Sequence, residues 1–482
     1  MTDPNLENRA PKDLPKAPDA PSVFERDGED THFGIPEETV NAVILALEAN
    51  QDQLVRELMA PLHFADAADL LETLSVDDRR QLLEVAHEVL DPEFYSELDE
   101  TVRDEAVDII GLDAVAETVA ELDIDDAVEF VDELDEHEQK HVLEAIPAAD
   151  RTLIEQGLSY PEDSAGRLMQ REVMTVPKFW SVGETIDYMR TNADKSATDF
   201  GNIFYDLVVV DPRHTPLGTV PLSVLLQSQR PVAITDIMHE EMKLVPVDLD
   251  QEEVAFLFRQ RDLVSAPVVG DDGRLVGMIT IDDVVDVIDE EAEDDILRLG
   301  GLQEDDLYAA AVDTTRSRFS WLFVNLMTAI LASSVIGFFQ GTIEQVVALA
   351  VLMPIVASMG GNAGTQTMTV AVRALATKEL TTTNAMRQIG KETLVGGING
   401  ILFAVLMGNV AWLWFSSPGL GIVIGLAMII NMLVAGVTGA AIPIMLERRG
   451  IDPALASSVF LTTVTDVVGF LVFLGLGTAF LL

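Results

Sequence analysis

The sequence predicts a multidomain protein in which an all-α region, an α/β region and a five-helix α membrane region follow one another along 482 residues. Three observations predict this order. Residues 62–84 repeat at 122–144, short β-branched runs begin near residue 161, and five long apolar stretches occupy the last third. A chain of this length is too long for one domain.

The N-terminal residues 1–35 are rich in Pro, Asp and Glu and lack a long apolar core. We expect a disordered acidic tail rather than a secretion signal. The chain has no cysteine, which excludes a disulfide framework, a thiolate metal site and a cysteine nucleophile.

The 60-residue repeat follows the tail. Nine positions agree in character without a gap, beginning with Leu62 against Leu122 and ending with Leu83 against Leu143. Apolar residues at intervals of three and four predict amphipathic helices, and their repetition predicts a stacked helical superstructure. Two unrelated acidic helices with similar patterning are the alternative, which agreement at nine positions disfavours.

The α/β region contains the strand-like runs Leu207–Val210, Ala266–Val269 and Leu275–Ile279. The segment from Asp236 to Val284 resembles a CBS module, and an earlier copy runs from Met169 to about Leu226.

CBS modules pair and commonly sense adenine nucleotides, with a Thr and an Asp three residues later holding the ribose. Thr280 and Asp283 fit this pattern, whereas the first copy has Val224 at the place of the acid. The resemblance therefore implies at most one nucleotide site per chain, for ATP, at the second module.

Charge divides the chain in two. Residues 319–482 hold six acids and six bases, so 75 of the 81 acids and 24 of the 30 bases precede them, and the net charge of −51 lies in the first part. Such a surface repels nucleic acid and anionic lipid and attracts cations. A salt-adapted cytoplasmic surface explains much of the surplus, in keeping with only eight lysines.

Apolar stretches fall at about 319–340, 345–372, 393–415, 420–446 and 454–482. Each meets the requirement of about 20 residues for a membrane-spanning helix. Basic residues precede the first stretch and lie between the second and third and between the fourth and fifth: Arg316, Arg318, Arg373, Lys378, Arg387, Lys391, Arg448 and Arg449. The positive-inside rule places these loops and the acidic region in the cytoplasm of a cell-membrane protein, with the C-terminus outside.

Asp466 is the only charged side chain between Pro453 and Leu482, and Thr462, Thr463 and Thr465 lie beside it. A carboxylate at membrane depth is costly and usually marks an ion, proton or substrate pathway. A protonated Asp bonded to a neighbouring helix is the alternative interpretation.

The second apolar stretch contains Gly360-Gly361-Asn362-Ala363-Gly364. Two glycines followed by polar residues can expose carbonyl groups to a water-filled path, and the same small residues also permit close helix packing. The motif alone leaves both roles open.

A charged segment, residues 286–298, precedes the first membrane stretch without an interrupting proline. It is typical of a helix that joins a sensor to a pore, although a solvated linker would have a similar charge run.

Together these features closely resemble the MgtE family of magnesium channels over about residues 36–482. The shared order is an acidic helical N domain, the segment Tyr160–Met169 opening a CBS pair, a plug helix, and five membrane helices carrying Gly-Gly-Asn-Ala-Gly and Thr-Asp. The resemblance implies an all-α superhelical N domain (36–160), an α/β tandem CBS pair (161–290), a plug helix (291–317) and a five-helix α transmembrane domain (318–482). It also implies a homodimer with its pore on the two-fold axis.

By this resemblance Asp466 matches the pore aspartate that binds magnesium through its hydration shell. Backbone around Thr462 and Gly360-Gly361 would complete the site, and Asn362, Thr463 and Thr465 would orient waters. Magnesium dehydrates reluctantly and is usually bound by one or two carboxylates, which suits two copies of Asp466 on one axis.

The family also closes when cytosolic magnesium bridges acids of the N domain, CBS pair and plug. The matching positions are Asp125, Asp126, Asp250, Glu252, Asp262, Asp283, Asp286, Glu291, Asp294 and Asp295. Where a short acid such as Asp294 replaces a longer Glu, the bridging distances would differ.

Three alternatives stand beside a magnesium-gated magnesium channel. The cargo could be manganese or cobalt, because oxygen ligands discriminate imperfectly among divalent ions. A membrane hydrolase using Asp466 would need a second intramembrane acid or His, and none lies within the apolar stretches. A nucleotide-sensing scaffold would leave Asp466 without a role.

Overall fold

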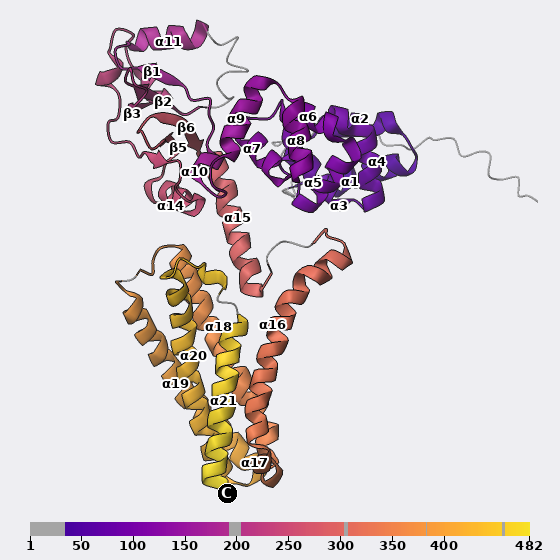
Figure 1. Cartoon of the computed structure of the whole chain (residues 1–482), viewed down its shortest axis with the longest axis vertical. Coiled ribbons are helices and arrows are strands. Elements are labelled where there is room, and N and C mark those ends of the chain that lie inside the picture. Colours follow the sequence, from indigo (N-terminus) through magenta and orange to yellow (C-terminus); the bar gives the residue numbers. More distant parts are fainter. Residues whose placement is uncertain (1–33, 192–203, 303–306, 382, 456–457) are drawn as a thin grey trace, which may run out of the picture. The chain divides into compact units, whose positions relative to one another are not determined.

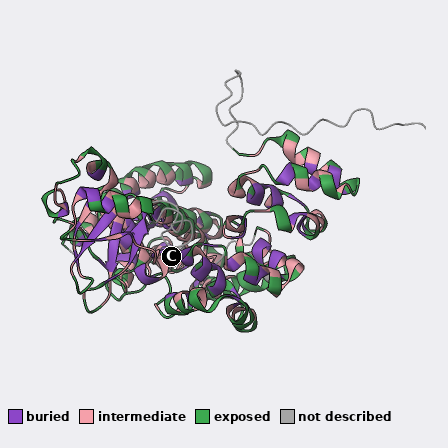
Figure 2. Cartoon of the chain, turned by 90° about the horizontal axis from the view of Figure 1, so that it is seen from above, coloured by how far each residue is buried: buried purple, intermediate pink, exposed green. Residues whose placement is uncertain are grey.

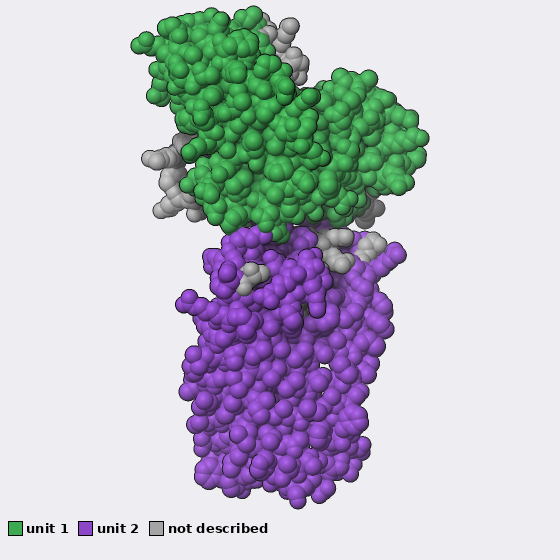
Figure 3. Space-filling model, turned by 60° about the vertical axis from the view of Figure 1, so that its left-hand side comes forward, with its two compact units in different colours: residues 1–287 green, residues 288–482 purple. Residues whose placement is uncertain are grey.

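The structure is a computed structural model that describes residues 34–191, 204–302, 307–381, 383–455 and 458–482. The predicted acidic tail lies outside these residues except for its last two. The chain forms two compact units, residues 1–287 and 288–482, which are coloured separately in Figure 3. Each unit is described by itself below.

The first unit begins with a stack of short helices, drawn in indigo and violet in Figure 1. Their bounds are α1 Glu37–Glu48, α2 Asp52–Met59, α3 Phe64–Thr73, α4 Val76–Ala86, α5 Glu100–Ile110, α6 Leu112–Val119, α7 Ile124–Glu133, α8 Glu136–Ala145 and α9 Ala148–Leu158. Two 3₁₀ turns, His87–Val89 and Pro92–Tyr95, lie between α4 and α5.

The helices confirm the predicted repeat. Helices α3 and α4 begin 60 residues before α7 and α8, and α2 begins 60 residues before α6, so the repeat extends beyond the matched segments. Side-chain caps start the second helix of each pair. The Ser75 hydroxyl accepts from the Asp78 N–H at 3.3 Å, and Asp135 with Glu138 forms a capping box.

The α/β part holds two small sheets of the same topology. Their strands are β1 Thr175–Pro177, β2 Asp206–Val210 and β3 Pro216–Pro221, then β4 Val245–Pro246, β5 Ser265–Val269 and β6 Leu275–Thr280. In each sheet the first pair is parallel and the second antiparallel, with a register shift near the end of the middle strand. The strands carry mostly buried residues, purple in Figure 2.

Short helices connect these strands: α10 Ala165–Leu168, α11 Val182–Thr191, α13 Leu222–Gln227, the 3₁₀ turn Ile234–Asp236 and α14 Gln251–Arg261. The two copies share one strand order because each is built from the same sequence pattern of β-branched runs, which confirms the predicted tandem arrangement of α/β modules.

Helix α15, Ile281–Gly300, follows β6 directly and runs through the division between the two units. The domain boundary expected at residue 290 therefore falls inside one continuous helix. The helix ends at Gly300 and is followed by Gly301, whose φ of +79° favours glycine and where a Cβ would overlap the Trp321 indole.

The second unit contains five helices long and apolar enough to cross a membrane: α16 Ala311–Phe338, α18 Ala348–Ala376, α19 Ala385–Phe415, α20 Pro418–Glu447 and α21 Ser458–Leu481. The short α17 Gln340–Gln345 follows α16, and the 3₁₀ turn Pro453–Leu455 precedes α21. Five crossings were predicted. Helix α19 begins eight residues before its apolar stretch, because Arg387, Lys391 and Glu392 continue the helix.

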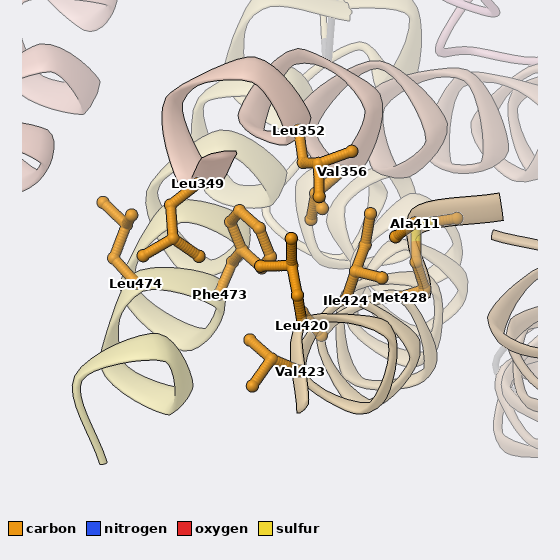
Figure 4. Close-up of a cluster of buried hydrophobic side chains, with 11 residues drawn as sticks. Leu349, Leu352, Val356, Ala411, Leu420, Val423, Ile424, Met428, Phe473 and Leu474 are labelled. Atoms are coloured by element: carbon orange, nitrogen blue, oxygen red, sulfur yellow. The ribbon is translucent and has the colours of Figure 1, made fainter. Parts of the chain in front are cut away.

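The core of the second unit joins α18, α19, α20 and α21 (Figure 4). Leu352 and Val356 of α18, Ile424 of α20 and Phe473 of α21 are fully buried in it. Helix α20 is the most buried of the five spans, and α16 is the least. This apolar cluster sets the positions of the two helices that carry the predicted pore motifs.

Candidate metal centres

The predicted pore motifs meet where α18 crosses α21. A Cβ placed on Gly361 would lie 3.3 Å from the Thr462 methyl group, and one on Gly364 would lie 2.9 Å from a Leu461 methyl group. The small residues of α18 therefore let the two backbones approach closely. Asn362, next to Gly361, is exposed on α18, and its amide lies 3.4 Å from the Ser358 hydroxyl.

Asp466 lies one helical turn beyond Thr462 on α21, so both residues share a face of that helix. Asp466 is partly exposed in the single chain. Thr462 therefore contacts Gly361 of α18, and Asp466 lies on the same face of α21 one turn further along.

The three threonines beside Asp466 differ. The hydroxyls of Thr462 and Thr463 both donate to the Val459 carbonyl, at 3.2 and 2.6 Å. Thr465 is fully buried, and its hydroxyl donates to the Leu461 and Thr462 carbonyls. Thr462 and Thr463 are half-buried, so of the three only Thr465 is enclosed by the protein.

Gly360 faces a different neighbour from Gly361. It is buried against the Asn431 amide of α20, and Gly469 of α21 packs on the same amide. The Asn431 Nδ2 donates to the Val356 carbonyl at 2.9 Å, while its Oδ1 is buried without a hydrogen-bond partner among the described residues. Sequence reasoning missed Asn431, although an amide side chain in the middle of a long apolar helix is a recognisable signal.

Glu392 is a second acid inside a candidate span, in α19, and only 8 % of its surface is exposed. The Thr367 hydroxyl and the Gln388 amide donate to its two oxygens at 3.3 and 3.2 Å. The prediction that Asp466 has no acidic companion among the spans was wrong, because the apolar stretch was started one residue after Glu392.

In the first unit, acids of α7 face acids at the start of α15. Burial raises the pKa of Asp125 well above its usual range, and Asp283 and Asp126 raise it further. Burial also raises the pKa of Asp126 and of Asp283 to about 7. Asp125 is 8 % exposed, and its Oδ1 has no hydrogen-bond partner among the described residues. Three carboxylates share a site short of positive charge.

This acidic contact extends along both helices. Burial and then Asp282 raise the pKa of Asp123, and burial and then Asp286 raise the pKa of Glu97. The predicted regulatory acids Asp125, Asp126, Asp283 and Asp286 are therefore brought together. Asp123 and Glu97 were missed, because the spacing of acids in sequence does not say which of them face another helix.

Asp250, Glu252 and Asp262 lie elsewhere. Asp250 caps the start of α14, where its Oδ1 accepts from the Glu252 N–H at 2.9 Å. Asp262 ends the same helix with a φ of +53° and lines a cavity. At 1.5 Å per residue the two ends are about 18 Å apart, so these acids do not form one site within a chain.

The predicted plug acids lie in the second unit near one base. The Arg298 guanidinium donates to Asp294 at 2.5 Å and to Asp452 at 2.7 Å. Burial raises the pKa of Asp295, as does the neighbouring Asp452. Glu291 interacts electrostatically with the same guanidinium.

The predicted nucleotide residues bond to each other. The Thr280 hydroxyl donates to Asp283 at 2.9 Å, and Thr280 is 4 % exposed. A cavity of about 490 Å³ lies between the two CBS copies and is lined by other residues, including Phe204, Tyr205 and Lys243.

No three His, Cys, Asp or Glu side chains within the described ranges are arranged so that they could hold a metal ion in one chain. A site shared across a two-fold axis, or completed by water, needs fewer ligands from each chain.

Three protein families match the chain. "Divalent cation transporter" matches residues 353–476, "MgtE intracellular N domain" matches 62–163, and "CBS domain" matches 234–290. The magnesium transporter MgtE of Thermus thermophilus is 31 % identical over 435 residues, which cover 89 % of this chain and 95 % of the relative.

The magnesium transporter MgtE of Bacillus subtilis is 28 % identical over 77 % of this chain and 83 % of its own. Among solved structures, the cytosolic domain of the Mg²⁺ channel MgtE in complex with ATP is similar at 27 % identity, with a TM-score of 0.47, covering 52 % of this chain and 99 % of that one.

Proposed function

The chain belongs to the MgtE family of magnesium transporters, and from this premise we propose that it is a Mg²⁺-selective channel closed by cytosolic Mg²⁺. The family consists of transporters rather than enzymes, which removes the membrane hydrolase. Magnesium enters the cytoplasm down its electrochemical gradient, through a pore that contains Asp466.

Asp466 carries the pore proposal. It is the one charged residue of α21, it is partly exposed, and it shares a helix face with Thr462 beside Gly361. Because each chain supplies one such carboxylate, we propose a homodimer with two copies of Asp466 near the axis. Two carboxylates would neutralise the ion while leaving it several waters.

The pore is tested by magnesium flux into liposomes. Asp466→Ala and Asp466→Asn are both expected to reduce flux at least tenfold, because the path loses its charge at membrane depth. Glu344→Gln is the matched control, since Glu344 is an exposed acid of the same unit bonded to Gln340. Undiminished flux in Asp466→Ala would remove Asp466 from the pore.

Ion preference is tested in the same liposomes with manganese and cobalt. A hydrated ion held through its waters is distinguished by size and hydration rather than by ligand softness. We expect magnesium to carry the largest flux. A larger flux of manganese or cobalt would identify the chain as a transporter of another divalent ion.

The acids between α7 and α15 support the gating proposal. Asp283 and Asp126 raise the pKa of Asp125, and Asp283 also raises that of Asp126, so a divalent ion would relieve their repulsion and draw α7 and α15 together. Plug acids Glu291, Asp294 and Asp295 are proposed to add to the same response. Asp250, Glu252 and Asp262 are proposed to act across the dimer, since they are separate within one chain.

Gating is tested by flux at rising internal magnesium. The triple variant of Glu291, Asp294 and Asp295 to the corresponding amides is expected to stay open at concentrations that close the wild type. The pair Asp126→Asn with Asp283→Asn is expected to act similarly. Unchanged closure in both variants would refute sensing by these acids.

Nucleotide binding has two candidate places in the CBS pair. Thr280 and Asp283 carry the sequence pattern of the second module. The cavity beside Lys243 offers aromatic side chains that can stack on an adenine ring, and the Lys243 ammonium group can pair with phosphate. ATP titration separates them, since Lys243→Gln weakens binding only in the cavity and Asp283→Asn only at the second module.

The proposed topology places the soluble domains in the cytoplasm and the C-terminus outside the cell membrane. The absence of native cysteine makes this measurable. A cysteine at Leu482 is expected to react with an impermeant thiol reagent in intact cells, and one at exposed Glu121 only after lysis. The reverse labelling pattern would invert the topology.

A further inference from the structure

Arg298 is the sole base between residues 275 and 315, on a helix that carries nine acids. An Arg paired with an Asp one turn earlier on an exposed helix is ordinary and contributes little. Arg298 differs because its guanidinium has a second partner, Asp452, 154 residues further along the chain.

The two contacts use different nitrogens. Nη2 donates to Asp294 Oδ2 at 2.5 Å, and Nη1 donates to Asp452 Oδ2 at 2.7 Å. Each of the three side chains is about one third exposed, at 33, 33 and 30 %. A charged hydrogen bond at this depth is stronger than a fully exposed pair.

Asp452 also orders the 3₁₀ turn that precedes α21 in the chain. Its Oδ1 accepts from the Ala454 N–H at 2.7 Å in that turn. One carboxylate therefore binds α15 through one oxygen and the turn Pro453–Leu455 through the other.

Leu299, the next residue, makes an apolar contact beside the ion pair. It packs against Met368 and Val372 of α18 and against Ala454 and Leu461 near α21. The last turn of α15 thus touches α18 and α21 through the apolar contact of Leu299, and the connection before α21 through the charged contact of Arg298.

We propose that Arg298 is a positioning residue that ties the last turn of α15 to the cytoplasmic ends of α18 and α21 through Asp452. This inference rests on the proposed gating function. The tie needs no metal ion. It holds the C-terminal end of α15 in place. A movement of the acidic N-terminal end of α15 would then be transmitted to α18 and α21, whereas a flexible connection would not transmit it.

A competing role for Arg298 predicts the opposite shift in the magnesium concentration that closes the channel. If the guanidinium merely occupied Asp294 and Asp452 in place of a divalent ion, its removal would free those carboxylates and make closure more sensitive to magnesium. If it is a tie, its removal weakens the coupling, and closure requires more magnesium. The two roles are separated by the direction of the shift.

The first experiment measures flux in liposomes at rising internal magnesium, normalised to the flux of each variant without internal magnesium. Arg298→Gln and Asp452→Asn are each expected to raise the half-closing concentration about fivefold, the effect of losing roughly one partly buried ion pair. The double variant is expected to match either single variant, because the two residues act through one contact. Arg449→Gln, which removes an exposed base near Asp452, is the control and is expected to cause no shift.

A lower half-closing concentration in Arg298→Gln, no shift, or a double variant whose shift is the product of the two single shifts would overturn the proposal. A second readout does not depend on transport. In magnesium-free detergent solution, the backbone amides of residues 296–300 are expected to exchange hydrogen about fivefold faster in Arg298→Gln and Asp452→Asn than in wild type or Arg449→Gln. Unchanged exchange removes the tie itself. Faster exchange in the two variants, together with a wild-type channel that internal magnesium does not close, would refute the proposed gating and leave the Arg298–Asp452 contact standing.

Discussion

At the scale of single residues, the decisive feature is a set of carboxylates held together without a base. Asp125 is buried between α7 and α15, Asp126 and Asp283 are half-buried beside it, and both raise its pKa. A raised carboxyl pKa means that the folded state prefers the protonated acid. The stability this provides is present at low pH and is lost as the pH rises through about 7.

We therefore expect Asp126→Asn to stabilise the protein at pH 8 in the presence of a chelator, raising the first thermal unfolding transition by about 2–5 °C. At pH 5.5 the gain is expected to be smaller but still present, because the cost of protonating Asp126 on folding grows as the pH rises from the usual carboxyl range to about 7. The measurement is thermal unfolding of the full chain in detergent at both pH values.

Glu121→Gln serves as the control, since Glu121 is an exposed acid just before α7. With saturating magnesium at pH 8, the wild type should unfold at a higher temperature than Asp126→Asn, because the ion binds the wild-type carboxylates and not the amide. A lower transition temperature for Asp126→Asn at pH 8 with chelator would show that these carboxylates do not repel one another.

At the scale of elements, the two glycines of the membrane motif have separate tasks. Gly361 faces Thr462 on α21, whereas Gly360 packs on the Asn431 amide of α20. The sequence left pore lining and close packing as alternatives for the whole motif. The structure divides these roles between neighbouring residues, because adjacent positions on a helix point about 100° apart.

Gly360→Ala is expected to destabilise the second unit by about 1–3 kcal/mol, because its methyl group would collide with the Asn431 amide in a fully packed crossing. Thermal unfolding and the yield of folded protein in detergent would measure this loss. Gly337→Ala is the matched control, since a methyl group there meets no neighbouring atom within 4 Å of the described chain. Equal stability of the two variants would contradict the close packing at Gly360.

The helical repeat shows what elements reveal beyond sequence. Two helix pairs were predicted from nine matching positions, and the structure adds α2 and α6 at the same spacing. Helices α2 and α6 have the same length and begin 60 residues apart, but their side chains differ. A comparison of residues alone therefore overlooks them.

At the scale of the whole molecule, the charge of −51 lies almost entirely before the membrane segments. Mutual repulsion of this size destabilises a compact acidic unit and is screened by salt over about 10 Å at 0.1 M. The same negative charge can serve a salt-adapted surface or a magnesium sensor. The two roles differ in their response to monovalent and divalent cations.

We expect the first unfolding transition to rise by several degrees between 0.1 and 2 M KCl, through general screening. Millimolar MgCl₂ is expected to produce a further rise at constant ionic strength, and this second rise should disappear in the Asp126→Asn, Asp283→Asn pair. Thermal unfolding across both salts measures the two effects. A magnesium effect equal to that of KCl at matched ionic strength would assign all of the charge to salt adaptation.

The sequence by itself determined the order of the α, α/β and membrane regions, the five apolar helices, the paired α/β modules and the place of Asp466 inside the last apolar helix, because periodicity, span length and isolated charges are local properties. Only the tertiary structure decided which acids face one another, which glycine lies against Asn431, and that Arg298 reaches Asp452. Those contacts join residues far apart in the chain, and acids such as Asp250 and Asp283 look alike in sequence. Their difference arises from the helix that each one faces after folding.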